Sequence, residues 1–235
     1  MEPRYRPGDP RIAGGVSRID WLFRYEAVLD FVLGYPQPLR ILDFGCGNVG
    51  LGSVYTQPFA GIDIVPITPE VPNLHPIVGI HPFALKASVD LLCAIDVLEH
   101  IPVGERDLFF ATLRRVSQRF VILSYPTAQH GRAMDIESLA WLGADPPRWL
   151  LEHLAQPYLD SEWVEQAMAR HGFRSIAYYP HTTRMQHYLG CLNVAVDGPW
   201  KTQWLNEIYQ ARMQLEHSTT DQATYRDTWI LEGLA

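Results

Sequence analysis

Cysteine is scarce in this chain of 235 residues, which has only Cys46, Cys93 and Cys191. Their odd number and wide separation predict neither a disulfide framework nor a C-x-x-C metal site. The nine histidines form no H-x-x-x-H or H-E-x-x-H pattern, so the spacing gives no support to metal-dependent chemistry. We therefore expect reduced thiols in the core and no metal site.

Long basic runs and long apolar runs are also missing. The formal net charge is −7, which argues against binding of nucleic acid through a basic face. The first 15 residues contain no apolar signal core, and no run approaches the roughly 18 apolar residues of a membrane span. These absences predict a soluble cytoplasmic protein that engages neither nucleic acid nor a membrane.

The chain does contain a glycine-rich stretch between two short apolar runs, from Leu39 to Val65. The first run ends at Phe44, the second ends at Asp63, and between them lie Gly45, Gly47, Gly50 and Gly52. This order predicts a strand, a glycine-rich turn, a short helix and a second strand with an acid at its tip. In an open parallel sheet such a unit forms a nucleotide pocket, where the acid takes the ribose hydroxyls. We expect a ligand that contains adenosine.

Two features separate this stretch from a dinucleotide site, although Gly45-x-Gly47-x-x-Gly50 matches that fingerprint. The confirming acid should follow about 20 residues on, and Asp63 comes only 13 positions after Gly50. Asp43 places a carboxylate where a pyrophosphate would be repelled. S-adenosylmethionine (SAM) carries an ammonium and a sulfonium, so it fits both carboxylates better than NAD does.

Three segments in order resemble successive motifs of the class I SAM-dependent methyltransferases. They are Ile41–Gly47 (ILDFGCG), Gly61–Asp63 (GID) and Asp90–Pro102 (DLLCAIDVLEHIP). The closest likeness is to the branch with a V-L-E-H-hydrophobic-P segment after the fourth strand. The resemblance covers roughly residues 39–173, and residues 225–231 show a weaker similarity. In two places the chain departs from the family: Val49 stands where a third glycine is usual, and the adenine-loop segment 77–83 lacks its usual acid.

Alternating strands and helices predict an α/β fold with a doubly wound, mostly parallel sheet. The resemblance implies seven strands in a Rossmann-like order, with the last strand antiparallel. The patterns predict helices over 18–33, 105–116, 160–171, 185–194 and 201–216. They predict strands over 39–44, 76–80, 89–95, 119–124, 173–179 and 225–231, and a further strand that ends in 61–64. We expect a single domain over 1–235, with an N-terminal arm at 1–16, a lid-like connection at 128–157 and a helical insertion at 181–222.

The resemblance also implies which residues bind SAM. The methionine end, the ribose and the adenine would be held by Asp43, Gly45, Gly47, Asn48, Asp63, Ile64, Ile80, Asp96 and Val97, with Phe83 as the alternative to Ile80. For catalysis, His100 is the first candidate for a general base, with Glu99 beside it, because a histidine titrates near neutral pH. The alternatives are that this pair holds the strand end, or that Glu99 alone binds a metal ion or a cationic substrate. Tyr125, His130 and His153 are weaker candidates.

These observations lead to the hypothesis of methyl transfer to an O or N atom of a small-molecule acceptor by in-line displacement. An RNA or protein acceptor is a less favoured alternative. Two other classes stay open: a catalytically silent binding or partner protein that kept the fold, and an NAD-dependent oxidoreductase. The sequence predicts neither the acceptor nor the oligomeric state, since substrate choice depends on segments added to the fold.

Overall fold

The computed structural model describes residues 9–13, 19–143, 146–195 and 223–234. Their centre is a sheet of seven strands in the order β3-β2-β1-β4-β5-β7-β6. The strands are β1 (Ile41–Phe44), β2 (Phe59–Ile62), β3 (Leu74–Pro76), β4 (Val89–Ile95), β5 (Ser117–Pro126), β6 (Phe173–Thr183) and β7 (Thr224–Gly233). The first five pair in parallel, while β7 lies antiparallel between β5 and β6. The predicted fold class is confirmed.

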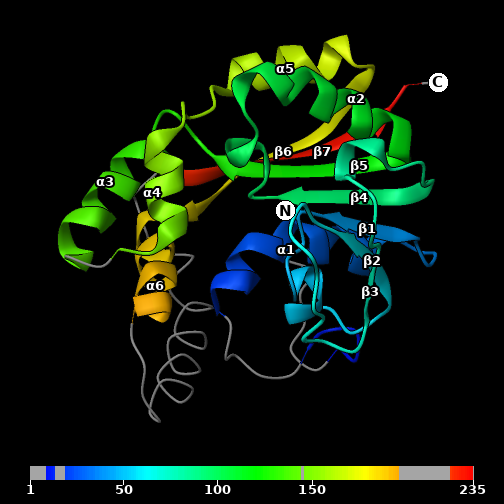
Figure 1. Ribbon diagram of the computed structural model, residues 1–235, viewed down its shortest axis with the longest axis horizontal. Coiled ribbons are helices and arrows are strands. Elements are labelled where there is room, and N and C mark those ends of the chain that lie inside the picture. Colours follow the sequence, from blue (N-terminus) through cyan, green and yellow to red (C-terminus); the bar gives the residue numbers. More distant parts are fainter. Residues whose placement is uncertain (1–8, 14–18, 144–145, 196–222, 235) are drawn as a thin grey trace.

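Helices cover both faces of this sheet (Figure 1). Helix α1 (Ile19–Gly34) lies on one face, and α2 (Arg106–Val116) and α5 (Ser161–Arg170) lie on the other. Strand β4 is buried along nearly its whole length, as expected for a central parallel strand. Helix α5 begins where sequence predicted, because the Asp160 carboxylate accepts the backbone N–H groups of Glu162 and Trp163 and so caps the first turn.

Three further helices gather beyond the carboxyl ends of β4, β5 and β6 (Figure 1). They are α3 (Gly131–Leu142), α4 (Arg148–Ala155) and α6 (Arg184–Ala195). Helices α3 and α4 belong to the connection expected at 128–157. Strand β6 runs to Thr183, so the insertion expected at 181–222 begins three residues later than predicted. Its second predicted helix, 201–216, lies outside the described residues.

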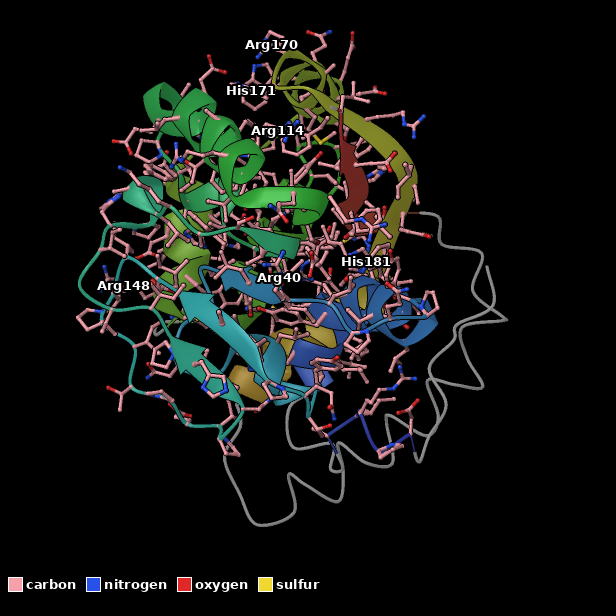
Figure 2. All side chains as sticks on the ribbon, turned by 90° about the vertical axis from the view of Figure 1, so that its right-hand side faces the viewer. Arg40, Arg114, Arg148, Arg170, His171 and His181 are labelled. Atoms are coloured by element: carbon pink, nitrogen blue, oxygen red, sulfur yellow. The ribbon has the colours of Figure 1, made fainter. Side chains whose placement is uncertain are left out.

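The amino ends of the strands are joined by Arg40, which faces the viewer in Figure 2. Its guanidinium donates to both carboxylate oxygens of Asp90 at 3.0 Å and to the side-chain oxygen of Gln118 at 3.0 Å. These contacts connect the starts of β1, β4 and β5. Ligands are therefore expected at the opposite, carboxyl ends of the same strands, which is where open α/β sheets bind them.

Two local expectations need correction. The third strand was predicted at 76–80 but is Leu74–Pro76, because the chain then turns at Gly79, whose φ is +76°. The short helix after the glycines is a single 3₁₀ turn, Gly50–Ser53. In the described part of the N-terminal arm, the Arg11 guanidinium pairs with Asp9 at 2.9 Å. The other arginines of the arm lie outside the described residues.

None of the helices in the described ranges has the length and apolar character needed to cross a membrane.

Gly50 explains the shift of the third glycine by one position. Its φ is +47°, and a Cβ atom there would lie 2.3 Å from Asp43 Oδ2 and 2.7 Å from Cys46 Cβ. Only a residue without a side chain fits this backbone against Asp43. Val49, which stands where the third glycine is usual, is itself buried.

We expect Gly50→Ala to lower the free energy of unfolding by about 2–5 kcal/mol, from left-handed strain of about 1–2 kcal/mol and overpacking of about 1–3 kcal/mol. Gly47→Ala is the matched control. Its φ is +55°, but no atom of the described residues lies within 4 Å of an added Cβ, so only the strain is expected. Urea denaturation of both variants measures the difference, and equal losses would contradict the packing role of Gly50.

Candidate functional site

The glycine turn after β1 packs against β4 on one side and is open on the other. The Gly45 N–H donates to the Ile62 carbonyl at 2.7 Å, and an added Cβ at Gly45 would lie 2.5 Å from Val97 Cγ2. Gly47 instead faces open space, and its N–H donates to Asp63 Oδ2 at 2.8 Å. The turn thus brings two predicted cofactor residues, Gly47 and Asp63, into direct contact beside free volume.

A groove of about 330 Å³ adjoins this contact and lies between the loops that follow β2 and β3. Its lining includes Asp63, Ile64 and Ile80, three residues that sequence assigned to the ribose and the adenine. Ile64 is 75% exposed and Val78, which also lines the groove, is 69% exposed. Exposed apolar side chains beside a carboxylate are suited to an aromatic base attached to a sugar.

Asp43 lies beneath the turn and is buried. Its Oδ2 accepts from the Tyr25 hydroxyl at 2.9 Å and from the Leu51 N–H at 2.7 Å, whereas Oδ1 has no hydrogen-bond partner within the described residues. Burial raises the pKa of Asp43 to about 7, although both hydrogen bonds act in the opposite direction. Asn48, by contrast, is engaged by the loop after β2, where its Oδ1 accepts from the Thr68 N–H at 2.9 Å.

At the tip of β4, Asp96 forms a buried ion pair that sequence did not predict. Arg226 of β7 donates to both of its carboxylate oxygens at 2.8 Å, and Arg24 of α1 lies 3.2 Å from Oδ2. Burial alone would raise the pKa of Asp96, but the two arginines outweigh it and hold that pKa well below its ordinary value. Asp96 also has a left-handed φ of +54°. Its side chain is therefore occupied within the protein.

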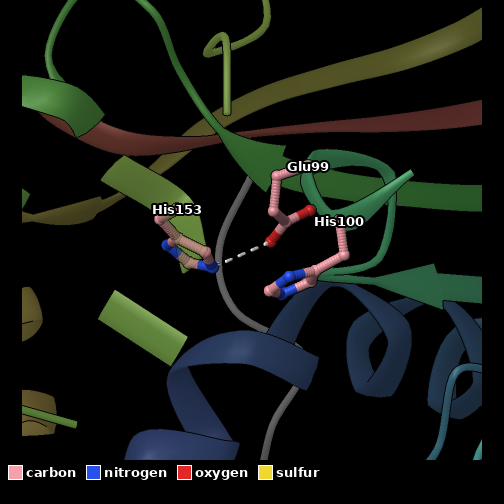
Figure 3. Close-up of side chains that lie close together, drawn as sticks. All are labelled: Glu99, His100 and His153. Atoms are coloured by element: carbon pink, nitrogen blue, oxygen red, sulfur yellow. Dashed lines mark ion pairs between the residues drawn. The ribbon is translucent and has the colours of Figure 1, made fainter. Parts of the chain in front are cut away.

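Glu99 and His100 follow in a short 3₁₀ turn, and His153 approaches them from α4 (Figure 3). Glu99 is buried, and neither of its carboxylate oxygens has a hydrogen-bond partner among the described residues. His153 Nε2 lies 3.7 Å from Glu99 Oε1, and the rings of His100 and His153 have centroids 5.0 Å apart. Burial and Asp96 raise the pKa of Glu99, while burial and His153 lower the pKa of His100.

A second buried carboxylate, Asp135 of α3, holds the far side of His153. Its Oδ2 lies 3.2 Å from His153 Nδ1, and its oxygens accept from the hydroxyls of Tyr225, at 2.9 Å, and Tyr158. Asp135 Oδ1 also lies 3.2 Å from Nε2 of His187 on α6. This cluster joins α3, α4, α6 and β7. Sequence reasoning missed Asp135, Tyr225 and Arg226, because their partners are up to 130 positions away.

Of the weaker catalytic candidates, only His153 joins the site. Tyr125 is buried in the core, where its hydroxyl accepts from Trp229 Nε1 at 3.0 Å. His130 precedes α3, and its backbone N–H donates to the Thr127 hydroxyl.

Comparison with known proteins gives a structural likeness only. No protein-family model and no curated protein sequence matches the chain. Among solved structures, magnesium protoporphyrin IX methyltransferase from Synechocystis PCC 6803, with S-adenosylhomocysteine (SAH) bound, has a TM-score of 0.54 and 14% identity over 93% of this chain and 84% of its own. A SAM-dependent methyltransferase from Archaeoglobus fulgidus has a TM-score of 0.52 and 14% identity over 88% and 91%.

The chain has the class I methyltransferase fold. The cyclase SpnF also shares it, with a TM-score of 0.52 and 13% identity over 89% of this chain and 80% of its own. At such identities the methyltransferase fold is shown and the reaction is not, since one fold hosts several chemistries.

The raised pKa of Asp43 predicts a pH-dependent stability. The folded protein keeps a proton on Asp43 up to about pH 7, whereas the unfolded chain releases it near about pH 4. Between these values the stability of the wild type falls as pH rises, by at most about 1.4 kcal/mol per pH unit for this group. Asp43→Asn cannot titrate, so its stability relative to the wild type should rise over this range and then level off. Urea denaturation of both proteins across the range tests this, and a constant difference would contradict it.

Loss of Arg226 should be costly because it leaves Asp96 buried and without its bidentate partner. We expect Arg226→Met to lower the free energy of unfolding by about 3–5 kcal/mol. Arg40→Met is the control, since the Arg40–Asp90 pair is solvent-exposed on the arginine side, and its effect should be much smaller. Chemical denaturation of both variants compares them. A similar loss in the two would show that the Asp96 pair contributes no more than a surface pair.

Proposed function

We propose that this chain is a SAM-dependent methyltransferase that transfers a methyl group to an O or N atom of a small molecule. The observation that carries the proposal is the groove beside the glycine turn, which unites Asp63, Ile64 and Ile80 next to the open face of Gly47. SAM, when bound, supplies a methyl group on a sulfonium leaving group. The protein itself would bind SAM and the acceptor, align them with each other and exclude water.

The residues of the site fit this cofactor. Asp63 would accept the ribose hydroxyls, and Ile64 and Ile80 would pack against the adenine faces. The unpartnered Oδ1 of Asp43 would favour the positively charged methionine end, with the backbone of Gly45 and Gly47 beside it. We assign Asn48, Asp96 and Val97 to the surrounding wall, because the side chains of Asn48 and Asp96 are engaged by the loop after β2 and by arginines.

The acceptor would lie on the β4 side of the turn, where Val97 lies against Gly45. Glu99 and His100 come within three residues after Val97. Alignment of acceptor and methyl group can lower a barrier by about 7–11 kcal/mol, and a general base such as His100 adds about 10²–10⁴-fold for a hydroxyl acceptor. Helices α3, α4 and α6 stand over this side and would form the acceptor cover.

Titration calorimetry with SAH tests the proposal directly. We expect binding by the wild type and at least about tenfold weaker binding by Asp63→Ala, because a hydrogen bond to a charged group contributes about 1.5–3 kcal/mol. Asp63→Asn keeps an acceptor for Gly47 and serves as a second variant. Asp107→Ala removes an exposed carboxylate on α2, whose side chain is 74% exposed, and should bind as the wild type does.

The other hypotheses predict different outcomes. Thermal protection by NAD(H) and not by SAH would favour the oxidoreductase. Absence of binding to either would overturn the proposal and favour a partner protein that kept the fold.

A further inference from the structure

Glu99 is a buried carboxylate that the surrounding protein leaves unsatisfied. Both of its oxygens lack a hydrogen-bond partner in the described part of the chain, although the side chain is only 5% exposed. An uncompensated buried carboxylate is costly, so such a group is expected to serve a ligand. Glu99 points toward His153 and His100 (Figure 3). One potential ligand atom from each of the three side chains lies within 4.8 Å of the others.

His153 is oriented as a metal-bound histidine is oriented. Its Nδ1 lies 3.2 Å from the carboxylate of Asp135, which is itself held by the hydroxyls of Tyr225 and Tyr158. With the ring proton on Nδ1, the lone pair of Nε2 faces Glu99. A carboxylate behind a histidine is the usual means of holding an imidazole for a metal ion. The Nε2 to Glu99 Oε1 distance is 3.7 Å, close to the roughly 3.4 Å between two ligands on one tetrahedral ion.

The type of ion follows from the donor atoms. Two imidazoles and one carboxylate favour zinc or another divalent first-row transition metal over magnesium or calcium, which prefer oxygen ligands. Three protein ligands leave a coordination position open, as in catalytic rather than structural sites. His100 has a side chain that is 35% exposed, so the cluster is reached from solvent on that side.

We propose that Glu99, His100 and His153 bind a divalent transition-metal ion, with Asp135 positioning His153. Sequence spacing gave no indication of this site, because the third ligand lies on another helix more than 50 residues after the first two. If the proposed function holds, the ion would be bound near the acceptor, because Glu99 and His100 closely follow Val97, which lies beside Gly45 of the glycine turn. The acceptor class is then one that presents an oxygen ligand to the ion, such as a hydroxyl or a phenol. Glu99 and His100 then act on the acceptor through the ion.

The experiment is titration of chelator-treated, full-length protein with Zn²⁺ and with Co²⁺, whose visible absorption reports tetrahedral or five-coordinate nitrogen and oxygen ligation. The wild type should bind one ion per chain with that absorption. Glu99→Gln and His153→Gln should lose the absorption and at least about tenfold in affinity. Asp135→Asn should weaken binding by about 10–100-fold while the spectrum remains. His75→Gln, at an exposed histidine of β3, should bind as the wild type does.

Circular dichroism of the metal-free variants shows whether each is folded. If His153→Gln does not fold, Glu99→Gln still provides the test, because glutamine has nearly the same shape as glutamate. Absence of binding by the wild type, or equal binding by folded Glu99→Gln, overturns the proposal and leaves only the 3.7 Å ion pair of Glu99 with His153. The metal titration contains no cofactor, so its outcome is independent of the SAH titration. Metal binding without SAH binding would retain the ion site and remove the methyltransferase assignment.

Discussion

The buried ion pair of Asp96 with Arg226 and Arg24 holds together the parts of the molecule on which the site depends. It joins the tip of β4 to the antiparallel strand β7 and to helix α1. Buried ion pairs contribute little net stability, but removing one partner is strongly destabilising, so β7 and the tip of β4 depend on each other through this pair. Arg226 also lies over the ring of Tyr225, whose hydroxyl binds Asp135. The position of β7 therefore sets the position of the polar cluster.

The candidate site has two halves of different character on either side of the glycine turn. On the β2 and β3 side, exposed isoleucines and Asp63 line an open groove. On the β4 and β7 side, buried carboxylates and imidazoles come from the segment after β4 and from α3, α4 and α6. The first half suits a nucleoside, and the second suits a polar acceptor or an ion. The same sheet supports both because the carboxyl ends of its parallel strands meet at one edge.

The fold itself leaves the chemistry open, as its likeness to both methyltransferases and a cyclase shows. The feature that the fold alone does not require is the buried Glu99, which has no hydrogen-bond partner among the described residues and lies beside a histidine held by Asp135. A group of this kind has a cost in the folded protein unless a ligand or an ion satisfies it. The function is therefore to be sought at Glu99 as much as in the cofactor groove.

By itself, the sequence determined the strand, turn and acid from Ile41 to Asp63 and the buried strand β4, because these features are local and depend on glycine conformation and apolar runs. It placed β3 wrongly, because a turn at Gly79 outweighed the apolar residues there. The tertiary structure alone decided why Gly50 stands one place late, since only packing against Asp43 demands it. It also decided that His153, Asp135 and Arg226 meet at the tip of β4. Contacts across up to 130 positions leave no periodicity or spacing in a single sequence.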